Sequence, residues 1–420
     1  MRRGKRVLVS IQVINLIEDI DPAKFENSLN GKTVIMAVTA SISIYRVPDI
    51  VRDLRREGAT VVVAMSREAV QLVNPEIMKW ASGNSVVTEI TGEIEHIKYF
   101  TDHPEDTLLL ICPASYNVIG KIASGISDDV PSLFFSFAFG NGNPVVICPA
   151  MHEGMMKNPV KLQNLQDLQS MGVIVVPPRI ESLKAKISDS ENILDYVSRS
   201  FNGQALNGKK VLIIGGRGEE TIDPVRTLTN HGSGFTASWF VRNAFRLGSE
   251  EVFFVGNSTF TIPEYARTLD AFTMEEFEEK TIDLIGKNKF DVIINTAALP
   301  DFSVVNRSME KIDSKKSVEL KLIPRKKLND LIREKYDGFL AVFKLSGEFS
   351  MSAINEKFRN SSPDLIVFNP YSSGDGAFGL VSNDYTIITG NELEELGKVS
   401  KAEMSWKVLS RISELVQKEK

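Results

Sequence analysis

The stretch GKTVIMAVTASIS, residues 31–43, decides the fold class. It begins with a run of β-branched and other apolar residues, continues with small hydroxyl residues, and is followed by the amphipathic segment RVPDIVRDLRREG. A second stretch, NGKKVLIIGGRGEE at residues 207–220, has the same order and ends in glycines. Each stretch predicts a buried first strand that enters a loop and then a helix.

Apolar runs alternate with helical patterns after both stretches. The first half contains ATVVVAMS, TLLLICPA and NPVVICPA, and the second half contains EEVFFVG, FDVIINTAA and DGFLAVFK. This alternation predicts an α/β protein with two doubly wound, Rossmann-like domains, and 420 residues suit two domains. We expect an N-terminal extension at residues 1–30, a first domain at 31–200 and a second at 206–420, joined by a polar linker at 198–210.

Composition excludes several classes of function. The net charge is −5 and basic residues are not clustered, so no nucleic-acid partner is expected. The two cysteines, Cys112 and Cys148, give neither a disulfide framework nor a zinc-binding spacing, which fits a cytoplasmic protein. The N-terminus has a basic start and an apolar run, but Ser10, Gln12 and Asn15 interrupt it. No membrane role is therefore expected.

The residues that follow the strands of the first half are the candidate ligand-binding residues, because ligands of such folds lie at the carboxyl ends of the strands. These are the small polar turn at 39–43 and two Cys-Pro-Ala turns that begin at Cys112 and Cys148. The hydroxyl groups could cradle a phosphate or simply cap a helix. The cysteines are interpreted as structural. His96 could be a core histidine or a base, and its sequence context alone leaves both open.

Taken in order, these pieces resemble the flavin-dependent cysteine decarboxylase family. That family has a Gly-Ser-Ile-Ala-like turn, a His-Ile pair, Pro-Ala-Thr-Ala-Asn-Thr and Pro-Ala-Met-Asn-x-x-Met. This chain has residues 39–43, His96-Ile97, residues 113–117 and residues 149–155 in the matching places, over about residues 31–195. The resemblance implies a flavodoxin-like domain that binds FMN. The implied FMN contacts are Thr39, Ser41, Ser43, Ser66, Pro113, Ser115, Asn117 and Met151.

The resemblance also implies a reaction, in which FMN oxidises the thiol end of a C-terminal cysteine so that its carboxylate can leave as CO₂. His96 matches the catalytic histidine of the family, and His103 is interpreted as a loop residue. His152 replaces the asparagine that holds the substrate carboxylate, and it could still donate a hydrogen bond. The region of the bacterial flap cysteine, VPPRIESLKAKISDSENILDYV, lacks cysteine, as in the archaeal branch.

The densest motif of the second half is IIGGRGEETIDPVRTLTNHGSG, in which glycines permit close approach of an anion. Together with AALPDF at residues 297–302 and Lys311-Ile312, it resembles phosphopantothenate–cysteine ligase over about residues 208–418. The resemblance implies catalytic roles for Asn230 and Lys311. The implied nucleotide contacts are Gly215, Gly216, Glu219, Asp223, Asp301 and Phe343.

This ligase chemistry joins a carboxylate to a nucleotide and then to cysteine, so cations such as Mg²⁺ and Lys311 must offset the charges that meet. Arg217 replaces a threonine of the family motif, and the segment after Asn230 has lost a hydroxyl group and a lysine. The nucleotide, CTP or ATP, stays open.

The two resemblances, in this order, predict a bifunctional enzyme of coenzyme A synthesis. It would ligate 4′-phosphopantothenate with L-cysteine and decarboxylate the product to 4′-phosphopantetheine. The decarboxylase family places FMN between the subunits of trimers, which implies a homo-oligomer. The alternatives are a flavoprotein-fold binding or regulatory protein without catalysis, and a decarboxylase that acts on another cysteine terminus.

Overall fold

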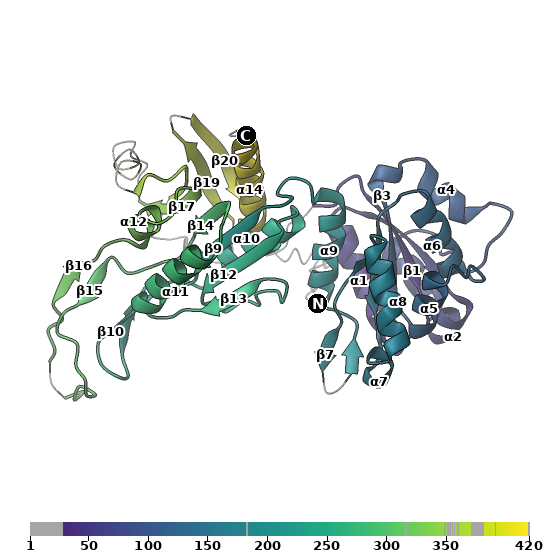
Figure 1. The fold of residues 1–420 in the computed structure, drawn as a ribbon, viewed down its shortest axis with the longest axis horizontal. Helices are drawn as coiled ribbons and strands as arrows, with labels where there is room; N and C mark the ends of the chain where they lie inside the picture. The colour runs from purple at the N-terminus through teal and green to yellow at the C-terminus, as the bar shows by residue number, and fades with distance from the viewer. Residues whose placement is uncertain are drawn as a thin grey trace, which may run out of the picture.

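The computed structural model describes residues 28–181, 184–315, 317–347, 350, 354, 356, 358, 361–370, 382–390 and 392–418. These residues form two α/β lobes, each built around its own sheet (Figure 1). The predicted fold class is therefore confirmed. Most of the expected extension, residues 1–27, lies outside the described residues. Leu29 is fully buried in the core of the first lobe.

The first sheet is parallel and has the strand order β2-β1-β3-β4-β6. Its strands are β1 (Thr33–Val38), β2 (Thr60–Met65), β3 (Thr107–Ala114), β4 (Val145–Pro149) and β6 (Ile174–Val175). Its helices are η1 (Ile42–Arg46), α1 (Val47–Arg56), α2 (Arg67–Leu72), α3 (Pro75–Ser82), α4 (Glu95–Thr101), η2 (Pro104–Asp106), α5 (Tyr116–Ala123), α6 (Val130–Gly140), α7 (Glu153–Met156), α8 (Pro159–Ser170) and α9 (Ser190–Asn202). A small antiparallel sheet joins β5 (Met151–His152), β8 (Lys184–Lys186) and β7 (Arg179–Glu181).

Strand β1 shows why this sequence forms a central strand. Val34, Met36 and Val38 pack into the core on one face with residues of α1, α3 and α9. Ile35 and Ala37 pack into the core on the other face with residues of α4, α5, α6 and α8. Because successive side chains of a strand point to opposite faces, only a continuous apolar run satisfies both cores.

The second sheet has the order β13-β12-β9-β14-β17-β18-β19-β20. Its strands are β9 (Lys210–Gly215), β12 (Glu251–Gly256), β13 (Arg267–Asp270), β14 (Val292–Asn295), β17 (Phe339–Ser346), β18 (Leu365–Pro370), β19 (Asn383–Thr389) and β20 (Glu392–Val399). Its helices are α10 (Phe235–Arg246), α11 (Met274–Lys287), α12 (Leu328–Arg333) and α14 (Lys401–Lys418). The pairs β18–β19 and β19–β20 are antiparallel, whereas the other pairs of this sheet are parallel. The alternation of strands and helices in the sequence did not predict these two antiparallel pairs.

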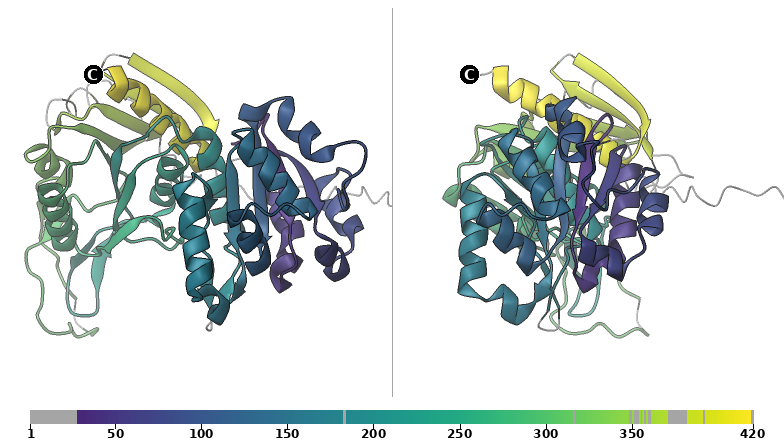
Figure 2. Two further views of the ribbon diagram at one scale, coloured as in Figure 1. Left: turned by 45° about the vertical axis from the view of Figure 1, so that its right-hand side comes forward. Right: turned by 90° about the vertical axis from the view of Figure 1, so that its right-hand side faces the viewer.

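Two narrow ribbons extend from the second lobe (Figures 1 and 2). One pairs β10 (Glu219–Thr221) with β11 (Thr227–Thr229), and the other pairs β15 (Phe302–Val304) with β16 (Leu322–Pro324). The second ribbon carries the segment that contains Lys311 at its far end. Among the described residues, no helix is long and apolar enough to cross a membrane.

The junction between the lobes differs from the predicted linker at 198–210. Helix α9 continues to Asn202, so only residues 203–209 separate it from β9. The helical end of this segment is packed, because Ser198 is fully buried and Arg199 donates hydrogen bonds to the carbonyl oxygens of Phe245 (2.6 Å) and Ser249 (3.0 Å), whereas Gln204 and Asn207 are exposed. A polar stretch that looked like a linker is thus part of a packed interface.

A buried ion network fixes this junction. Asp195 of α9 has no exposed surface, and its carboxylate accepts hydrogen bonds from Arg242 (2.6 Å) and Arg246 (2.7 Å) of α10 and from Tyr265 (2.8 Å). Since α9 also packs on the first sheet through Ile193, it belongs to both lobes. A buried carboxylate with three donors is satisfied only when the lobes hold this arrangement.

Candidate active sites

Both candidate sites lie where the strand order of their sheet reverses. In the first sheet this point is between β1 and β3, and in the second it is between β9 and β14. The chain leaves neighbouring strands in opposite directions there, which opens a crevice above the carboxyl ends of the strands.

The strand ends of the first lobe are tied together by hydroxyl groups. Thr39, directly after β1, is buried; its Oγ1 donates to the carbonyl oxygen of Pro113 (2.7 Å) and accepts from the backbone N–H of Ser115 (3.0 Å). The Oγ of Ser41 donates to the carbonyl oxygen of Ala150, after β4 (3.2 Å). The structure therefore brings the ends of β1, β3 and β4 together, as the sequence predicted.

Three of the predicted hydroxyl residues also cap helices. Ser66 accepts from the N–H of Ala69 at the start of α2 (3.1 Å), and Ser115 accepts from the N–H of Val118 at the start of α5 (3.4 Å). Ser41 accepts from the N–H of Ser43, which is itself buried (3.4 Å). These residues can cap a helix and also bind a ligand, because a cap leaves other N–H groups of the helix start available to a phosphate.

The remaining predicted flavin-site residues lie around this cluster. Asn117 is exposed in the first turn of α5. Met151 is half-buried and His152 is exposed, and both lie on the short strand β5. Strand β8 pairs with β5 in antiparallel register. Strands β7 and β8, in the segment that matches the flap of the bacterial relatives, therefore form a hairpin beside His152.

His96 lies near the start of α4 and is half-buried. Its ring meets Phe137 of α6 edge-on, with 6.1 Å between ring centroids and an interplanar angle of 82°. The Nδ1 atom is buried and has no hydrogen-bond partner among the described residues. Within the described part of the chain, His96 makes no hydrogen bond to the hydroxyl cluster at the strand ends. An orphaned buried imidazole nitrogen fits a group that completes its bonding with a ligand.

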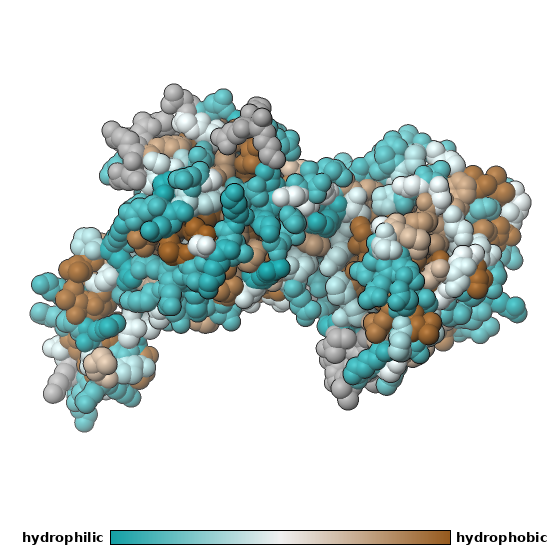
Figure 3. All heavy atoms as spheres, viewed as in Figure 1, coloured by the Kyte–Doolittle hydropathy of each residue, from teal (hydrophilic) through white to brown (hydrophobic). Residues whose placement is uncertain are grey.

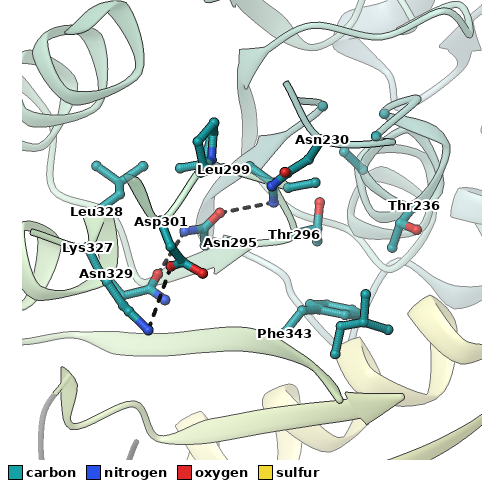
Figure 4. A pocket seen from close by; sticks show the side chains of 18 of the residues that line it. Asn230, Thr236, Asn295, Thr296, Leu299, Asp301, Lys327, Leu328, Asn329 and Phe343 are labelled. Atoms are coloured by element: carbon teal, nitrogen blue, oxygen red, sulfur yellow. Dashed lines mark hydrogen bonds and ion pairs between the residues drawn. The ribbon is translucent and has the colours of Figure 1, made fainter. Parts of the chain in front are cut away.

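The second lobe has a cavity of about 380 Å³ above β9, β14 and β17. The predicted residues Gly216, Asn230, Asp301 and Phe343 line it, as Figure 4 shows for the three side chains. Gly215 lies beneath it: a Cβ there would lie 2.1 Å from the Cβ of Ala237, so glycine lets β9 and α10 touch. The structure therefore gathers five of the eight predicted ligase residues.

Glu219, Asp223 and Lys311 do not line the cavity. Glu219 lies on β10 of the first ribbon. The carboxylate of Asp223 accepts hydrogen bonds from the N–H groups of Val225 (2.8 Å), Arg226 (2.8 Å) and Ile312 (3.1 Å). Although burial favours the neutral acid, these bonds lower the pKa of Asp223 to about 2. Asp223 thus attaches the segment that carries the exposed Lys311 to the first ribbon.

Sequence reasoning missed most of the cationic, amide and threonine side chains of the cavity wall. Those that line it are Thr236, Asn295, Thr296, Arg325, Lys326, Lys327, Asn329, Lys344, Asn369 and Lys401. Asp301 lies 3.8 Å from the ammonium of Lys327, and both lie with Asn329 at one end of the cavity, whereas Thr236 and Phe343 lie at the other (Figure 4). Asn295 ends strand β14 and Thr296 follows it, which is a usable signal, whereas Arg325-Lys326-Lys327 has the pattern of a solvated charge run.

Arg325 has a structural task at the base of the second ribbon. Its guanidinium contacts the carboxylates of Glu220 (2.6 Å) and Glu278 (3.0 Å), and the backbone N–H of Arg325 donates to the carbonyl oxygen of Asp301 (3.0 Å). The carboxylates take up much of its charge. Lys326, Lys327 and Lys344 are then the neighbouring cations of the cavity wall.

Family models match the two lobes separately. Residues 22–202 match the family Flavoprotein, and residues 206–416 match the C-terminal domain of the DNA/pantothenate metabolism flavoproteins. The fold and its two switch-point sites thus define a two-domain protein, with a flavoprotein domain followed by a pantothenate-metabolism domain.

Relatives that match nearly the whole chain identify the family within this class of two-domain proteins. The coenzyme A biosynthesis bifunctional protein CoaBC of Thermococcus kodakarensis is 33% identical over 395 residues, which cover 92% of this chain and 96% of that protein. The protein of the same name from Methanocaldococcus jannaschii is 32% identical over 400 residues (93% and 95%), and that of Bacillus subtilis is 28% identical over 406 residues (92% and 98%). The chain belongs to the CoaBC family, and the resemblance predicted from its motifs is confirmed.

Proposed function

We propose that this protein catalyses two successive steps of coenzyme A biosynthesis. The second lobe ligates 4′-phosphopantothenate with L-cysteine, and the first lobe decarboxylates the product to 4′-phosphopantetheine. The observation that supports this most directly is the family match along the whole chain, combined with a candidate site at the switch point of each sheet. A pair of consecutive activities on one chain also explains why both lobes are kept together.

In the ligase cavity, an oxygen of the 4′-phosphopantothenate carboxylate attacks the α-phosphorus of CTP or ATP. The bond from that phosphorus to its bridging oxygen breaks, and pyrophosphate leaves. The cysteine amine then attacks the acyl carbon, loses a proton, and releases the nucleoside monophosphate. Asn230, which lines the cavity, would hold the acyl group, and Lys326, Lys327 and Lys344 would offset the anionic charge.

Lys311 reaches this reaction through the second ribbon. Strand β15 begins directly after Asp301, and β16 ends directly before Arg325, so both ends of the ribbon are anchored in the cavity wall. Movement of the ribbon would carry Lys311 relative to the nucleotide. Mg²⁺ is expected to arrive with the nucleotide phosphates, which is how magnesium is usually held in such sites. Within the described residues, no group of three or more His, Cys, Asp or Glu side chains forms a metal site of its own.

The residues of the first lobe fit FMN. Thr39, Ser41, Ser43 and Ser115 present hydroxyl and N–H groups at the start of η1 and α5, which suits the ribityl and phosphate groups. When bound, the flavin supplies the oxidation that makes the cysteine terminus able to lose CO₂. His96 is half-buried with an unpartnered Nδ1, so it can hold or move a proton beside the substrate. His152, exposed beside the β7–β8 hairpin, is the candidate donor to the substrate carboxylate.

The protein is proposed to form a homo-oligomer built from trimers. Figure 3 shows brown, hydrophobic surface on the first lobe. Among the large side chains that are exposed on this lobe are Ile42 (83% exposed), Tyr45 (68%) and Trp80 (65%). Ile42 and Tyr45 lie on η1, next to the proposed flavin cradle. A subunit contact there would cover them and close the flavin site.

One reaction tests the proposed function. Purified protein is incubated with 4′-phosphopantothenate, cysteine, Mg²⁺ and either CTP or ATP, and the products are identified by mass spectrometry. We expect 4′-phosphopantetheine with one of the two nucleotides. If phosphopantothenoylcysteine accumulates instead, the ligase stands and the missing flap cysteine becomes the suspected defect. If neither product forms with either nucleotide, a binding or regulatory role replaces the proposal.

A further inference from the structure

We infer that Lys401 is a phosphate-binding residue of the ligase cavity, contributed by the C-terminal helix α14. Lys401 is the first residue of that helix and lines the cavity, 100 residues after Asp301 and 171 residues after Asn230. This inference rests on the proposed ligase function, because it assigns a role within the same cavity.

Lys401 is held firmly in this position. On α10, the Nδ2 of Asn243 donates to the carbonyl oxygen of Ala402 (2.9 Å) and to the Oγ of Ser405 (2.8 Å), and all of these atoms are buried. Ser400 caps the helix by accepting from the N–H of Glu403 (3.1 Å). The start of α14 is therefore fixed against α10, and this packing determines where the side chain of Lys401 lies.

The side chain is unusually buried for a lysine. Only 6% of Lys401 is exposed, and its ammonium lies 5.4 Å from the ring centroid of Phe235, another residue of the cavity wall. Lysine is rarely buried without a reason, because the ammonium loses its hydration. Burial lowers the pKa of Lys401 to about 8. A phosphate that enters the cavity would compensate this loss and favour the charged form.

The surroundings suit an anion as well. Gly232, Ser233 and Gly234 form the turn before α10, and they line the cavity together with the first residues of that helix. A Cβ at Gly232 would lie 2.9 Å from the carbonyl oxygen of Gly216, so this turn packs closely on the glycine loop of β9. The starts of α10 and α14 thus meet at one cavity, where backbone N–H groups and the ammonium of Lys401 can bind one phosphate group.

Two phosphates of the reaction could occupy this position, namely the phosphate chain of the nucleotide and the phosphate of 4′-phosphopantothenate. Both offer the same chemistry to an ammonium, and the two substrates can be varied separately. Lys407 provides a matched control, because it lies on the same helix, is partly exposed and pairs with Glu403 (2.8 Å).

The test compares the full-length wild type with Lys401→Met, Lys401→Arg and Lys407→Met. Pyrophosphate release gives kcat and the KM for each substrate, calorimetry gives the affinity for each substrate alone and for inorganic tripolyphosphate, and thermal unfolding checks the fold. We expect Lys401→Met to raise the KM and Kd of one phosphate ligand by about 10- to 100-fold with little change in thermal stability. Lys401→Arg should retain most of the affinity, and Lys407→Met should behave as wild type.

The ligand whose KM rises identifies the source of the phosphate. In the wild type, that KM should rise above about pH 8, where Lys401 loses its charge, and this rise should be weaker in Lys401→Arg. The other ionisable groups that line the cavity are Asp301, Arg325, Lys326, Lys327 and Lys344, and they are the same in all variants. Unchanged KM values for both substrates in a folded Lys401→Met would overturn the inference.

A Lys401→Gln variant that keeps both KM values, while Lys401→Met loses stability, would also overturn it, because the residue would then only support the packing of α14. Failure of the proposed ligase function looks different. The wild type would release no pyrophosphate, whereas tripolyphosphate binding would still depend on Lys401 if the inference holds.

Discussion

The two crevices of this protein occupy the same topological position but are built differently. In the first lobe, Thr39, Ser41 and Ser115 at the strand ends are hydrogen-bonded to neighbouring strand ends. In the second lobe, Asn230 and Asp301 border an open cavity of about 380 Å³ with several cations in its wall. The fold fixes where a ligand can bind, and the side chains after each strand decide what kind of ligand it is.

The difference matches two kinds of occupant. A cofactor that stays bound is served by a prearranged set of hydroxyl and N–H groups, because these groups lose little conformational entropy when the cofactor binds. Charged substrates that enter and leave are served by an open cavity with lysine side chains in its wall, such as Lys326, Lys327 and Lys344. If this comparison is right, changes in the first crevice should affect cofactor retention and decarboxylation only, and changes in the second should affect ligation only.

The largest expected effect is on decarboxylation in His96→Asn. Loss of a proton-transferring imidazole should slow this step by about 10²- to 10⁴-fold and leave ligation intact. Mass spectrometry of the coupled reaction should then show accumulated phosphopantothenoylcysteine. His103→Asn, which changes an exposed loop histidine, is the control and should form 4′-phosphopantetheine normally. Normal decarboxylation by His96→Asn would remove His96 from the catalytic residues.

The next largest effect should come from the ion network that holds the two lobes together. Asp195→Asn leaves Arg242 and Arg246 without their buried counter-charge, which should lower the free energy of unfolding by about 3–5 kcal/mol. Glu191→Gln removes a 63% exposed partner of Arg242 and should cost less than about 1 kcal/mol. Denaturant unfolding of the wild type and both variants measures these differences in the free energy of unfolding. Equal effects would mean that the junction is solvated and that the lobes are independent.

Gly216→Ala tests the crowding at the ligase crevice. Gly216 has a φ of +95°, and a Cβ there would lie 2.1 Å from the carbonyl oxygen of Asn257. Gly208 also has a positive φ, +70°, but has open space around it. Gly208→Ala should therefore show only the cost of the left-handed backbone, about 1–2 kcal/mol, and Gly216→Ala about 1–3 kcal/mol more. Thermal unfolding and ligation rates should separate the two, and similar values would contradict the close packing.

Thr39→Val tests whether the first crevice is prearranged. The substitution removes the hydroxyl group that joins Pro113 and Ser115 and leaves the N–H of Ser115 without its acceptor, at a cost of about 1–3 kcal/mol. The flavin content of the purified protein, measured by absorbance, should fall, while ligation should be unchanged. Ser136→Ala, which removes a hydroxyl bound within α6, is the control. Full flavin content in Thr39→Val would argue against a cradle at this turn.

The smallest effect should be the acid dependence of Asp223. Its pKa is about 2 in the folded protein against an ordinary value of 3.8, so its carboxylate stabilises the fold above the ordinary value and loses this effect as the pH falls toward about 2. Asp223→Asn should lack this part of the pH dependence. The stability difference between wild type and variant should thus shrink on acidification. A difference that is constant with pH would show that Asp223 does not act through its charge.

Much of this protein could be predicted from local sequence. The apolar runs of β1 and β9, whose side chains fill both faces of a sheet, required central strands with helices on either side. The residues after the parallel strands, such as Thr39 and Ser115, were then predictable as candidate site residues because parallel strands end at the same edge, whereas Asn230 was implied only by the family resemblance. The edge strands β19 and β20 were missed, since their pairing depends on a sheet edge assembled from distant segments.

Only the tertiary structure decided the rest. Lys401 lies at the start of the C-terminal helix, and only the packing of α14 on α10 brings it to the ligase cavity. Asp223 holds the segment of Lys311 on the first ribbon and does not line the cavity. Residues 198–202 looked like a linker but form the end of a helix that contacts both lobes. The sequence alone determined the strands, their faces and the family. The partners of charged side chains were decided by long-range packing, because burial and electrostatic pairing depend on residues far apart in the chain.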